Sequence, residues 1–348
     1  MERRISKQIT VGGVKIGGGA PVSVQSMLNC DTHNTDACLN QIKELYAAGC
    51  DIVRLAVPDA DAAHAFCKIK EHSPLPMVAD IHFDYRLAIM CAKGGADKIR
   101  INPGNIGSTE RVRAVAEECK KRNIPIRIGV NGGSLEKKLT EKYKAPTPRA
   151  LCESALSHIK MLEDAGFYDI ALSLKSSDVK TTAEAYRLIA NEVNYPLHLG
   201  VTEAGTEYSG IIKNAMGIGS LLLSGIGDTI RVSLTAPPVR EVKAGIEILK
   251  AAGLRSGIKF VSCPTCGRCK VDMLPIADEV FGRLSSLDKN ITVAVMGCAV
   301  NGPGEARGAD IGIACGDGAA LIFKNGEILK KVPIERAADE LVKEAQQL

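Results

Sequence analysis

The chain has 348 residues, a formal net charge of +4 at pH 7, 4% aromatic residues and no tryptophan, so it lacks the basic field and stacking side chains of a nucleic-acid groove, and we expect no nucleic-acid partner. The first residues are charged and no later run approaches the ~18 apolar residues of a membrane span, so we expect neither an export signal nor a membrane location. Twelve cysteines without such a signal indicate a reducing compartment, and we expect the protein to be cytoplasmic.

Two glycines separate a pair of β-like runs near the N-terminus. Arg4–Thr10 and Val14–Ile16 flank Gly12 and Gly13, which predicts a β-hairpin. We assign residues 1–20 to this hairpin and expect it to lie at the floor of the domain that follows.

Short β-rich runs then alternate with amphipathic helical stretches at intervals of roughly 25–30 residues, as in parallel strands joined by crossover helices. The predicted strands are 22–27, 51–57, 77–81, 98–102, 125–131, 169–173, 196–202 and 229–234, and the predicted helices are 36–48, 60–72, 84–93, 108–122, 148–165, 178–194, 208–224 and 239–252. Eight such units favour a closed (β/α)8 TIM barrel over an open doubly wound sheet. We assign residues 21–255 to this barrel.

The predicted strands carry polar residues at every second position, on one face of each strand. A barrel core is normally filled by Val, Ile and Leu, so this polar face is unusual. It comprises Ser23, Gln25, Arg54, Asp80, His82, Arg100, Asn102, Arg127, Asn131, Ser173, Lys175, His198, Thr202, Arg231 and Ser233. The alternate residues are apolar and suited to face the helices, so the polar set is predicted to face the barrel interior.

Five of these inward residues are cations on different strands: Arg54, Arg100, Arg127, Lys175 and Arg231. An unpaired charge inside a barrel is costly, so an anion should lie among them. Arginine donates two parallel hydrogen bonds to phosphate, which favours a diphosphate or a multiply phosphorylated small molecule. Salt bridges to Asp80 and Glu203 are the alternative for any one cation, but too few acids share these positions to neutralise all five.

The segment 132–147 follows the fifth predicted strand and is longer than most βα loops. It contains Lys137, Lys138, Lys142 and Lys144. Two interpretations stay open: a mobile lid over an anion, or a solvated charged loop.

A smaller α+β domain is predicted over residues 256–348. Strands 259–262 and 291–296 each end at a cysteine motif, and a helix at 273–287 lies between them. A strand at 310–314, a hairpin of 320–323 and 327–331 around Asn325-Gly326, and a helix at 335–347 complete the domain.

Its two motifs are Cys263-Pro-Thr-Cys266-Gly-Arg-Cys269 and Gly297-Cys298-Ala-Val-Asn-Gly-Pro-Gly-Glu305. A C-x2-C pair on a tight turn and a later cysteine on a Gly/Pro-rich turn can bind one metal centre. Seven other cysteines, Cys30, Cys38, Cys50, Cys67, Cys91, Cys119 and Cys152, stand alone at irregular spacing and are interpreted as inert buried thiols.

The spacing leaves the metal and its ligands open. Zinc ribbons usually have two C-x2-C pairs, so an iron–sulfur cluster fits better, although structural zinc remains an alternative. Four thiolates would select Cys263, Cys266, Cys269 and Cys298. The C-x2-C-x2-C run is equally compatible with two ligands and one bystander.

These motifs resemble those of the 4-hydroxy-3-methylbut-2-enyl diphosphate synthase family of the non-mevalonate isoprenoid pathway, in its short two-domain bacterial form. The resemblance covers essentially the whole chain. It includes 261–268, 296–306, Arg54, 98–104, 127–131, 172–175, 198–203 and 229–233.

The resemblance implies a 4Fe-4S cluster bound by Cys263, Cys266, Cys298 and Glu305, with Cys269 as a bystander and Glu305 as an exchangeable ligand that opens one iron to substrate. It also implies reductive ring opening and dehydroxylation of 2-C-methyl-D-erythritol 2,4-cyclodiphosphate, with two electrons from flavodoxin or ferredoxin. A homodimer is implied too, in which the cluster domain of one chain caps the barrel of the other.

From the resemblance and the barrel cations together, we hypothesise a role for each candidate residue. The diphosphate is assigned to Arg54, Arg100, Arg127, Lys175, Arg231 and Ser262, and the carbon skeleton to Asp80, His82, Asn102 and Asn131. Glu203 is assigned as proton donor to the departing hydroxyl. The alternatives are an iron–sulfur hydro-lyase acting on a phosphorylated small molecule and a zinc-stabilised barrel that only binds a phosphate ligand.

Overall fold

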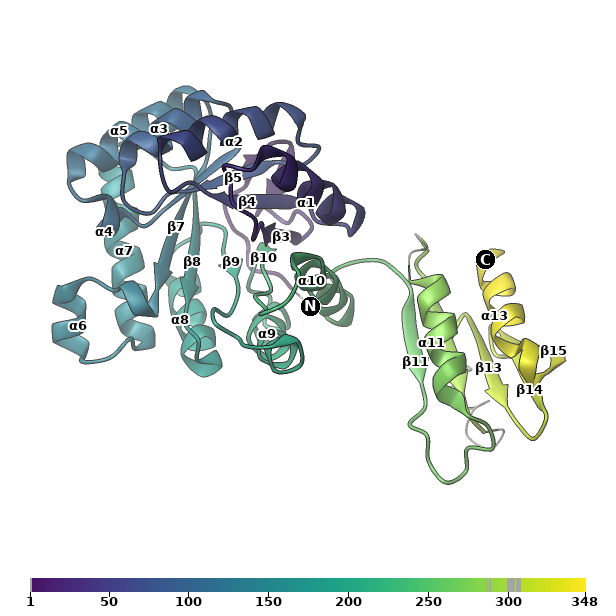
Figure 1. Ribbon diagram of the computed structural model, residues 1–348. Helices are drawn as coiled ribbons and strands as arrows, with labels where there is room; N and C mark the ends of the chain where they lie inside the picture. Colours follow the sequence, from purple (N-terminus) through teal and green to yellow (C-terminus); the bar gives the residue numbers. More distant parts are fainter. Residues whose placement is uncertain (1, 286, 288, 299–303, 305–307) are drawn as a thin grey trace. The chain divides into compact units, whose positions relative to one another are not determined.

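The computed structural model describes residues 2–285, 287, 289–298, 304 and 308–348. Its contacts divide the chain into two compact units, residues 1–255 and 256–348, and each unit is described by itself (Figure 1). Within the described ranges, none of the helices combines the length and apolar composition needed to cross a bilayer.

Eight parallel strands form the centre of the larger unit, and helices surround them (Figure 1). The strands are β3 Ser23–Met27, β4 Ile52–Ala56, β5 Met77–Asp80, β6 Lys98–Ile101, β7 Ile126–Asn131, β8 Ile170–Lys175, β9 His198–Leu199 and β10 Thr229–Ile230. They pair in the order β8-β7-β6-β5-β4-β3-β10-β9, and a parallel bridge between Leu172 and Leu197 joins the two ends of that order. The predicted (β/α)8 barrel is confirmed.

The predicted helices are present with small shifts at their ends. They are α1 Thr35–Ala47, α2 Ala60–His72, α3 Tyr85–Lys93, α5 Thr109–Lys121, α7 Pro148–Asp164, α8 Val179–Glu192, α9 Glu207–Leu222 and α10 Pro238–Ala251. Several begin at side-chain caps, as where Asp59 accepts a hydrogen bond from the Ala62 N–H at 2.9 Å, which satisfies a free N–H of the first turn.

Two short helices were not predicted: α4 Pro103–Ile106 and α6 Lys137–Tyr143. Leu139 is the buried residue of α6, so this helix lacks the apolar period that identifies longer helices. The segment 132–147 therefore contains a 3₁₀ turn at Gly132–Ser134 followed by a helix. Lys142 of that helix forms an ion pair with Glu153 of α7 at 2.7 Å.

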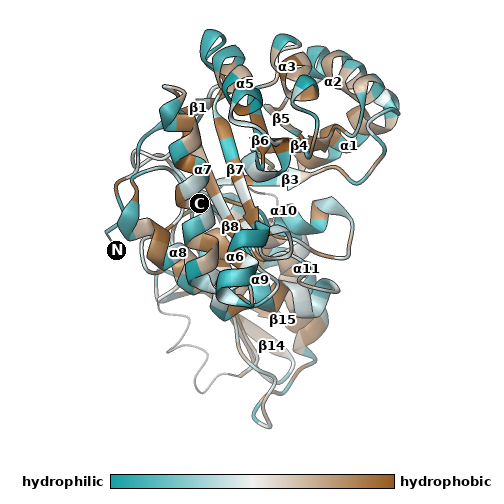
Figure 2. Ribbon diagram, turned by 90° about the vertical axis from the view of Figure 1, so that its left-hand side faces the viewer, coloured by the Kyte–Doolittle hydropathy of each residue, from teal (hydrophilic) through white to brown (hydrophobic). Residues whose placement is uncertain are grey.

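Along the strands, apolar and polar residues alternate between two buried faces. Ile99, Ile126, Leu197 and Ile230 are fully buried in the apolar cluster between the strands and the helices. The intervening positions line the lumen and are largely polar, and the ribbon of β7 changes between apolar and polar colours along its length in Figure 2. The barrel thus has an apolar outer core and a polar interior.

The last two strands are shorter than the predicted strands 196–202 and 229–234. The carboxylate of Asp228 accepts the Leu197 N–H at 2.8 Å, so a side chain takes the place of a strand partner where the ladder would begin. Arg231 N donates to Leu199 O at 3.0 Å, and regular pairing covers only two residues of each strand.

An antiparallel hairpin, β1 Ile9–Val11 and β2 Val14–Ile16, closes the N-terminal end of the lumen. Its side chains form one buried cluster with the first inward residues of three barrel strands; the members are Ile9, Val11, Ile16, Ile52, Val78 and Ala171. This apolar plug leaves the C-terminal end of the barrel as its mouth.

The smaller unit contains one five-stranded sheet, in the order β11-β12-β13-β14-β15. The strands are β11 Lys259–Ser262, β12 Thr292–Met296, β13 Ile311–Cys315, β14 Ala319–Lys324 and β15 Glu327–Pro333, with helices α11 Met273–Leu284 and α13 Ala337–Gln346. The first three strands are parallel and the last two antiparallel. Asn325 and Gly326 both have positive φ, at 50° and 83°, as the predicted tight hairpin requires.

Candidate active site

The barrel interior contains six cationic side chains. They are Arg54, Lys98, Arg100, Arg127 and Lys175, all buried, and the partly buried Arg231. Five of them were predicted to face inward, and the structure brings these five together. Lys98 was missed, although it precedes Arg100 by two residues and therefore shares its face of β6.

Strand register places several polar residues of the lumen on neighbouring strands at the same height. Arg100 lies opposite Arg127 and Asp80 lies opposite Arg100. Nearer the mouth, Asn131 lies opposite Lys175. The positions are fixed by backbone hydrogen bonds, so the polar groups are held rigidly before any ligand arrives.

Asp80 is the main anionic partner in the lumen. It accepts a hydrogen bond from Arg100 Nη1 at 3.0 Å, and its carboxylate lies 3.6 Å from Arg54 Nε and 3.6 Å from His82 Nε2. Burial alone would raise the pKa of Asp80, but the charge of Arg54 and the contacts with His82 and Arg100 outweigh it and lower that pKa. Burial also lowers the pKa of Arg54 to about 10.

The second carboxylate comes from helix α10. Glu241 lies 3.5 Å from Arg231 Nη2 and accepts a hydrogen bond from the Leu234 N–H at 2.9 Å. Sequence reasoning missed Glu241, although its helical spacing with Val242 and Gly245, which face the core, carried the signal. Among the described residues, Asp80 and Glu241 are the carboxylates that pair with these six cations.

Two inward glycines make room for the cations. A Cβ on Gly129 would lie 2.5 Å from Arg100 Nε, and one on Gly200 would lie 2.7 Å from Lys175 Nζ. The absence of a Cβ at these two positions therefore leaves room for the two cationic side chains.

Several buried donors of the lumen have no hydrogen-bond partner in the described part of the chain. These atoms are Nε of Arg100, Nε and Nη1 of Arg127, and Nε of Arg231. Buried guanidinium donors without acceptors are costly. Phosphate oxygens supply the acceptors and the negative charge that such a site lacks.

The two lysines and the histidine of the lumen have lowered pKa values. Burial, then the charges of Arg127 and other cations, hold the pKa of Lys98, Lys175 and His198 well below their ordinary values. The lumen is therefore strongly electropositive, and an anion entering it would relieve this repulsion.

The remaining predicted barrel residues lie at or near the mouth. Asn102 is buried and caps α4 through the Gly104 N–H at 3.2 Å, whereas Asn131 is partly buried and His82 is exposed. Glu203 is exposed and has a positive φ of 53°. A non-glycine residue rarely adopts this conformation, and such strain is concentrated at functional sites.

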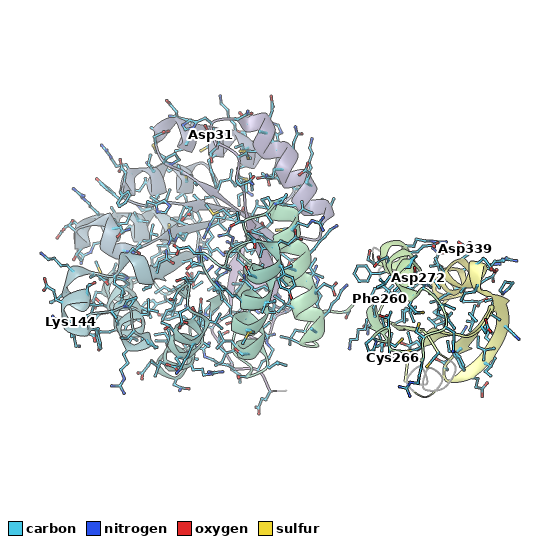
Figure 3. The ribbon with its side chains drawn as sticks, turned by 60° about the horizontal axis from the view of Figure 1, so that its bottom comes forward. Asp31, Lys144, Phe260, Cys266, Asp272 and Asp339 are labelled. Atoms are coloured by element: carbon cyan, nitrogen blue, oxygen red, sulfur yellow. The ribbon has the colours of Figure 1, made fainter. Side chains whose placement is uncertain are left out.

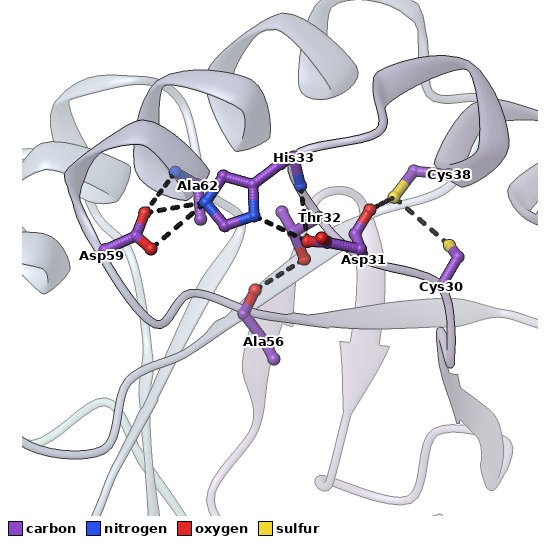
Figure 4. Close-up of polar contacts among 8 residues, drawn as sticks. All are labelled: Cys30, Asp31, Thr32, His33, Cys38, Ala56, Asp59 and Ala62. Atoms are coloured by element: carbon purple, nitrogen blue, oxygen red, sulfur yellow. Dashed lines mark hydrogen bonds and ion pairs between the residues drawn. The ribbon is translucent and has the colours of Figure 1, made fainter.

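A cluster of polar side chains connects the loop after β3 with the loop after β4 (Figure 4). His33 lies between two carboxylates, with Nδ1 2.6 Å from Asp31 and Nε2 2.9 Å from Asp59. Hydrogen bonding to both carboxylates raises the pKa of His33. Beside it the sulfurs of Cys30 and Cys38 are 3.3 Å apart, so these two cysteines meet in space despite their separation in sequence.

In the smaller unit, two of the predicted metal ligands follow adjacent parallel strands. Cys263 comes directly after β11 and Cys298 comes two residues after β12, and Ser262 lies opposite Val295. The Gly297 N–H donates to Cys263 Sγ at 3.1 Å. Both cysteines thus emerge at the same edge of the sheet.

The third predicted cysteine ligand, Cys266, is exposed in the loop after β11 (Figure 3). Hydrogen bonding from the backbone and side chain of Arg268 lowers the pKa of its thiol, which favours the thiolate that binds metal. Ser262 is also exposed at the end of β11. Glu305, the predicted fourth ligand, lies outside the described residues.

Cys269 and Cys315 are packed beneath this edge. Cys269 contacts the apolar core that contains α11 and donates to Val271 O at 3.1 Å, and a Cβ on Gly297 would lie 2.4 Å from its sulfur. Cys315, which the motif analysis overlooked, is fully buried at the end of β13, and burial raises its pKa to about 12. Both surroundings suit a packed thiol.

The donor set fits an iron–sulfur cluster in chemistry, since it offers thiolates at one sheet edge. Among the described residues, no three His, Cys, Asp or Glu side chains already form a group that could hold a metal. Cys263, Cys266 and Cys298 lie beyond the ends of the strands, so the metal itself would draw these ligands together.

Comparison with known proteins matches both units. Residues 6–246 match a family model described as the GcpE TIM-barrel domain, and residues 259–347 match one described as the GcpE protein C-terminal domain. Proteins named 4-hydroxy-3-methylbut-2-en-1-yl diphosphate synthase (flavodoxin) from Clostridium acetobutylicum and Clostridium perfringens are 60% and 59% identical, covering 99% of this chain and 99% of each relative.

A solved dihydropteroate synthase from Xanthomonas albilineans, in complex with 7,8-dihydropteroate, is 12% identical. Its TM-score is 0.51, and the alignment covers 71% of this chain and 97% of that one. This similarity supports the barrel fold alone.

Proposed function

This chain belongs to the GcpE family, and on that premise we propose that it catalyses reductive ring opening and dehydroxylation of 2-C-methyl-D-erythritol 2,4-cyclodiphosphate to 4-hydroxy-3-methylbut-2-enyl diphosphate. The observation that supports this most directly is the barrel lumen, where six cations meet two carboxylates and buried guanidinium donors lack acceptors. A cyclic diphosphate supplies both the charge and the acceptor oxygens.

Two electrons and one proton balance the atoms and the charge of the proposed reaction. The cyclic diphosphate dianion takes two electrons and one proton, one ring C–O bond breaks, one hydroxyl leaves as water, and a linear diphosphate trianion remains. Glu203, exposed at the mouth, is the proposed donor of the proton to the departing hydroxyl. Arg54, Arg100, Arg127, Lys175 and Arg231 hold the diphosphate, and Asp80 fixes Arg100 and Arg54 in place.

A 4Fe-4S cluster bound by Cys263, Cys266, Cys298 and Glu305 would supply single electrons and one iron with an exchangeable ligand. Flavodoxin, which the names of the relatives specify, is the proposed electron donor, with ferredoxin as the alternative. Ser262, next to Cys263, is the proposed phosphate contact from this unit.

The test is anaerobic turnover with reduced flavodoxin and the cyclic diphosphate. We expect brown protein with about four irons per chain and linear diphosphate formed at two electrons per molecule. Conversion without any reductant would instead indicate a hydro-lyase. Colourless protein containing one zinc, with no conversion, would favour a phosphate-binding barrel.

The ligand set has its own test. Glu305→Ala should keep part of the iron and lose turnover, whereas Cys269→Ala should keep both because its thiol is packed against the core. Iron analysis and turnover of the two variants decide between them. The opposite pattern would replace Glu305 by Cys269 as the fourth ligand.

We further propose a homodimer in which the cluster unit of one chain serves the barrel of its partner. Mixing Arg127→Ala protein with Cys298→Ser protein under exchange conditions should restore turnover, since a mixed dimer then has one intact pair of units. Continued inactivity of demonstrably mixed dimers would place the two working units in one chain.

A further inference from the structure

Lys98 has no assigned role in binding or chemistry, yet it is one of the largest fully buried side chains of the protein. It lies on β6, two residues from Arg100 and on the same face. Its side-chain nitrogen donates one hydrogen bond in the described part of the chain, to Gln25 Oε1 at 3.4 Å. No carboxylate in that part forms an ion pair with it.

Lys98 shares the lumen with Arg100 of its own strand and with Glu241 of α10. Charged and titratable groups also come from the other strands or from the residue after them, except for β3, which contributes the amide of Gln25. They are Arg54, Asp80, Arg127, Lys175, His198 and Arg231. Asp80 is engaged by Arg100, Arg54 and His82, and Glu241 by Arg231. Both available carboxylates are therefore committed to other cations.

The four guanidiniums carry four positive charges because arginine stays protonated in proteins. Against the two carboxylates they already leave an excess of two positive charges. A protonated Lys98 would add another buried charge; burial, and then the charges of Arg127 and Arg54, lower its pKa. A diphosphate in the mouth would reverse this balance, because its negative charge favours protonation of every nearby amine.

Three groups of the lumen could accept such a proton. His198 starts from an ordinary pKa near 6.5, about four units below that of lysine, so it is the weakest base. Lys175 faces four arginines and has no hydrogen-bond acceptor in the described residues. Lys98 faces fewer cations and has an acceptor, Gln25 Oε1, already directed at its amine.

We propose that Lys98 couples diphosphate binding to proton uptake: its amine is neutral in the ligand-free protein and takes one proton from solvent when a diphosphate occupies the mouth. It acts as a positioning residue behind the phosphate contacts. No bond other than N–H forms or breaks, and the proton returns to solvent when the diphosphate leaves. The inference rests on the proposed function for the chemistry of the ligand.

The test is isothermal titration of the full-length, cluster-loaded protein with a five-carbon alkyl diphosphate at pH 8. The terminal phosphate, with a second pKa of about 6, is then fully ionised and does not itself accept a proton from solution. Titrations in two buffers of different ionisation enthalpy give the number of protons taken up. We expect about one for the wild type, close to none for Lys98→Met, and about one for the exposed control Lys93→Met.

Two comparison variants identify the acceptor. Lys175→Met should weaken binding yet keep the uptake, and His198→Gln should keep it as well. Unchanged uptake in Lys98→Met, or uptake abolished only in Lys175→Met or His198→Gln, would overturn the inference.

Should Lys98→Met not fold, the pH dependence of Kd in the wild type can still contradict the proposal, and Lys175→Met and His198→Gln still test the other two acceptors. Uptake of one proton makes Kd rise about tenfold per pH unit over the interval in which Lys98 changes state, and a Kd that is flat from pH 7 to 9.5 would overturn the proposal. These titrations involve no turnover, so they can fail while reductive conversion succeeds, and the reverse also holds.

Discussion

The barrel lumen and the cysteine edge of the smaller unit differ in how far the fold alone positions their candidate binding groups. In the lumen, the cations project from hydrogen-bonded strands and are held close together despite their repulsion. At the cysteine edge, Cys263 and Cys298 follow adjacent strands, but Cys266 lies in an exposed loop. The fold therefore positions the side chains of the proposed anion site in advance, at a cost in stability, whereas the proposed metal site would depend on the metal for its final geometry.

The largest expected effect comes from Cys298→Ser, which tests whether diphosphate binding in the barrel is independent of the iron bound by the smaller unit. Cys298→Ser should remove turnover and bound iron completely, because a cluster ligand is lost. Binding of an alkyl diphosphate to the barrel should stay within about twofold, a change of ~0.4 kcal/mol. Iron analysis, turnover and calorimetry measure the three quantities, with Cys67→Ser, a thiol of the barrel, as the control. If the diphosphate affinity fell together with the iron content, the barrel lumen and the cysteine edge would form a single site.

A substitution in the lumen should lower the affinity for diphosphate and raise the stability of the ligand-free protein. Arg127→Met removes charge-assisted hydrogen bonds to the diphosphate, so affinity should fall by about 1.5–3 kcal/mol. The same change removes a fully buried charge whose Nε and Nη1 have no hydrogen-bond partner among the described residues, so the free energy of unfolding without ligand should rise by about 1–4 kcal/mol.

The matched control for that substitution is Arg122→Met, whose guanidinium forms a surface ion pair with Glu118. It should change neither quantity by more than about 0.5 kcal/mol. Equal affinity of wild type and Arg127→Met would contradict the assignment of the lumen as the anion site.

A smaller effect is expected from the glycine that accommodates Arg100. In Gly129→Ala the new methyl group would occupy the place of the guanidinium, which lies within 3.0 Å of it, and the flexible arginine should shift away. We expect about a tenfold loss of diphosphate affinity, ~1.4 kcal/mol, with little loss of stability. Gly133→Ala is the control, since nothing lies within 4 Å of its added Cβ. Equal behaviour of the two variants would mean that Arg100 needs no fixed position.

The smallest effect concerns the His33 cluster at the mouth. Asp31 and Asp59 raise the pKa of His33 in the folded protein, so its stabilising contribution is full below the unfolded pKa of about 6.5 and is lost as the pH rises through the folded value. The difference in Tm between wild type and His33→Gln should therefore be present at pH 6 and shrink towards pH 9. A difference that grows with pH would contradict this account of the cluster.

Much of the barrel could be predicted from residue patterns alone. Period-two alternation placed Arg54, Arg100 and Arg127 inside, because neighbouring residues of a strand must face opposite sides. Helix ends followed the capping residues to within a few positions. Helix α6 was not predicted because its seven residues include one buried leucine and therefore show no amphipathic period.

The contacts that the sequence did not predict share a cause. Glu241 sits on a helix and reaches Arg231 only because α10 packs against the strands, and Cys315 approaches the cysteine edge only through the pairing of β12 with β13. Cys30 and Cys38 likewise meet only through the folding of a loop. Such contacts depend on distances between elements, which no local pattern contains.

The amino-acid sequence by itself determined the inventory: which strand faces are polar, which cysteines stand in ligand-like motifs, and that the barrel would contain many more cations than acids. The tertiary structure decided which of these cations find a carboxylate and which remain without one. The reason is that electrostatic energy depends on separation and burial, and strand register and helix packing set both for groups far apart in the chain.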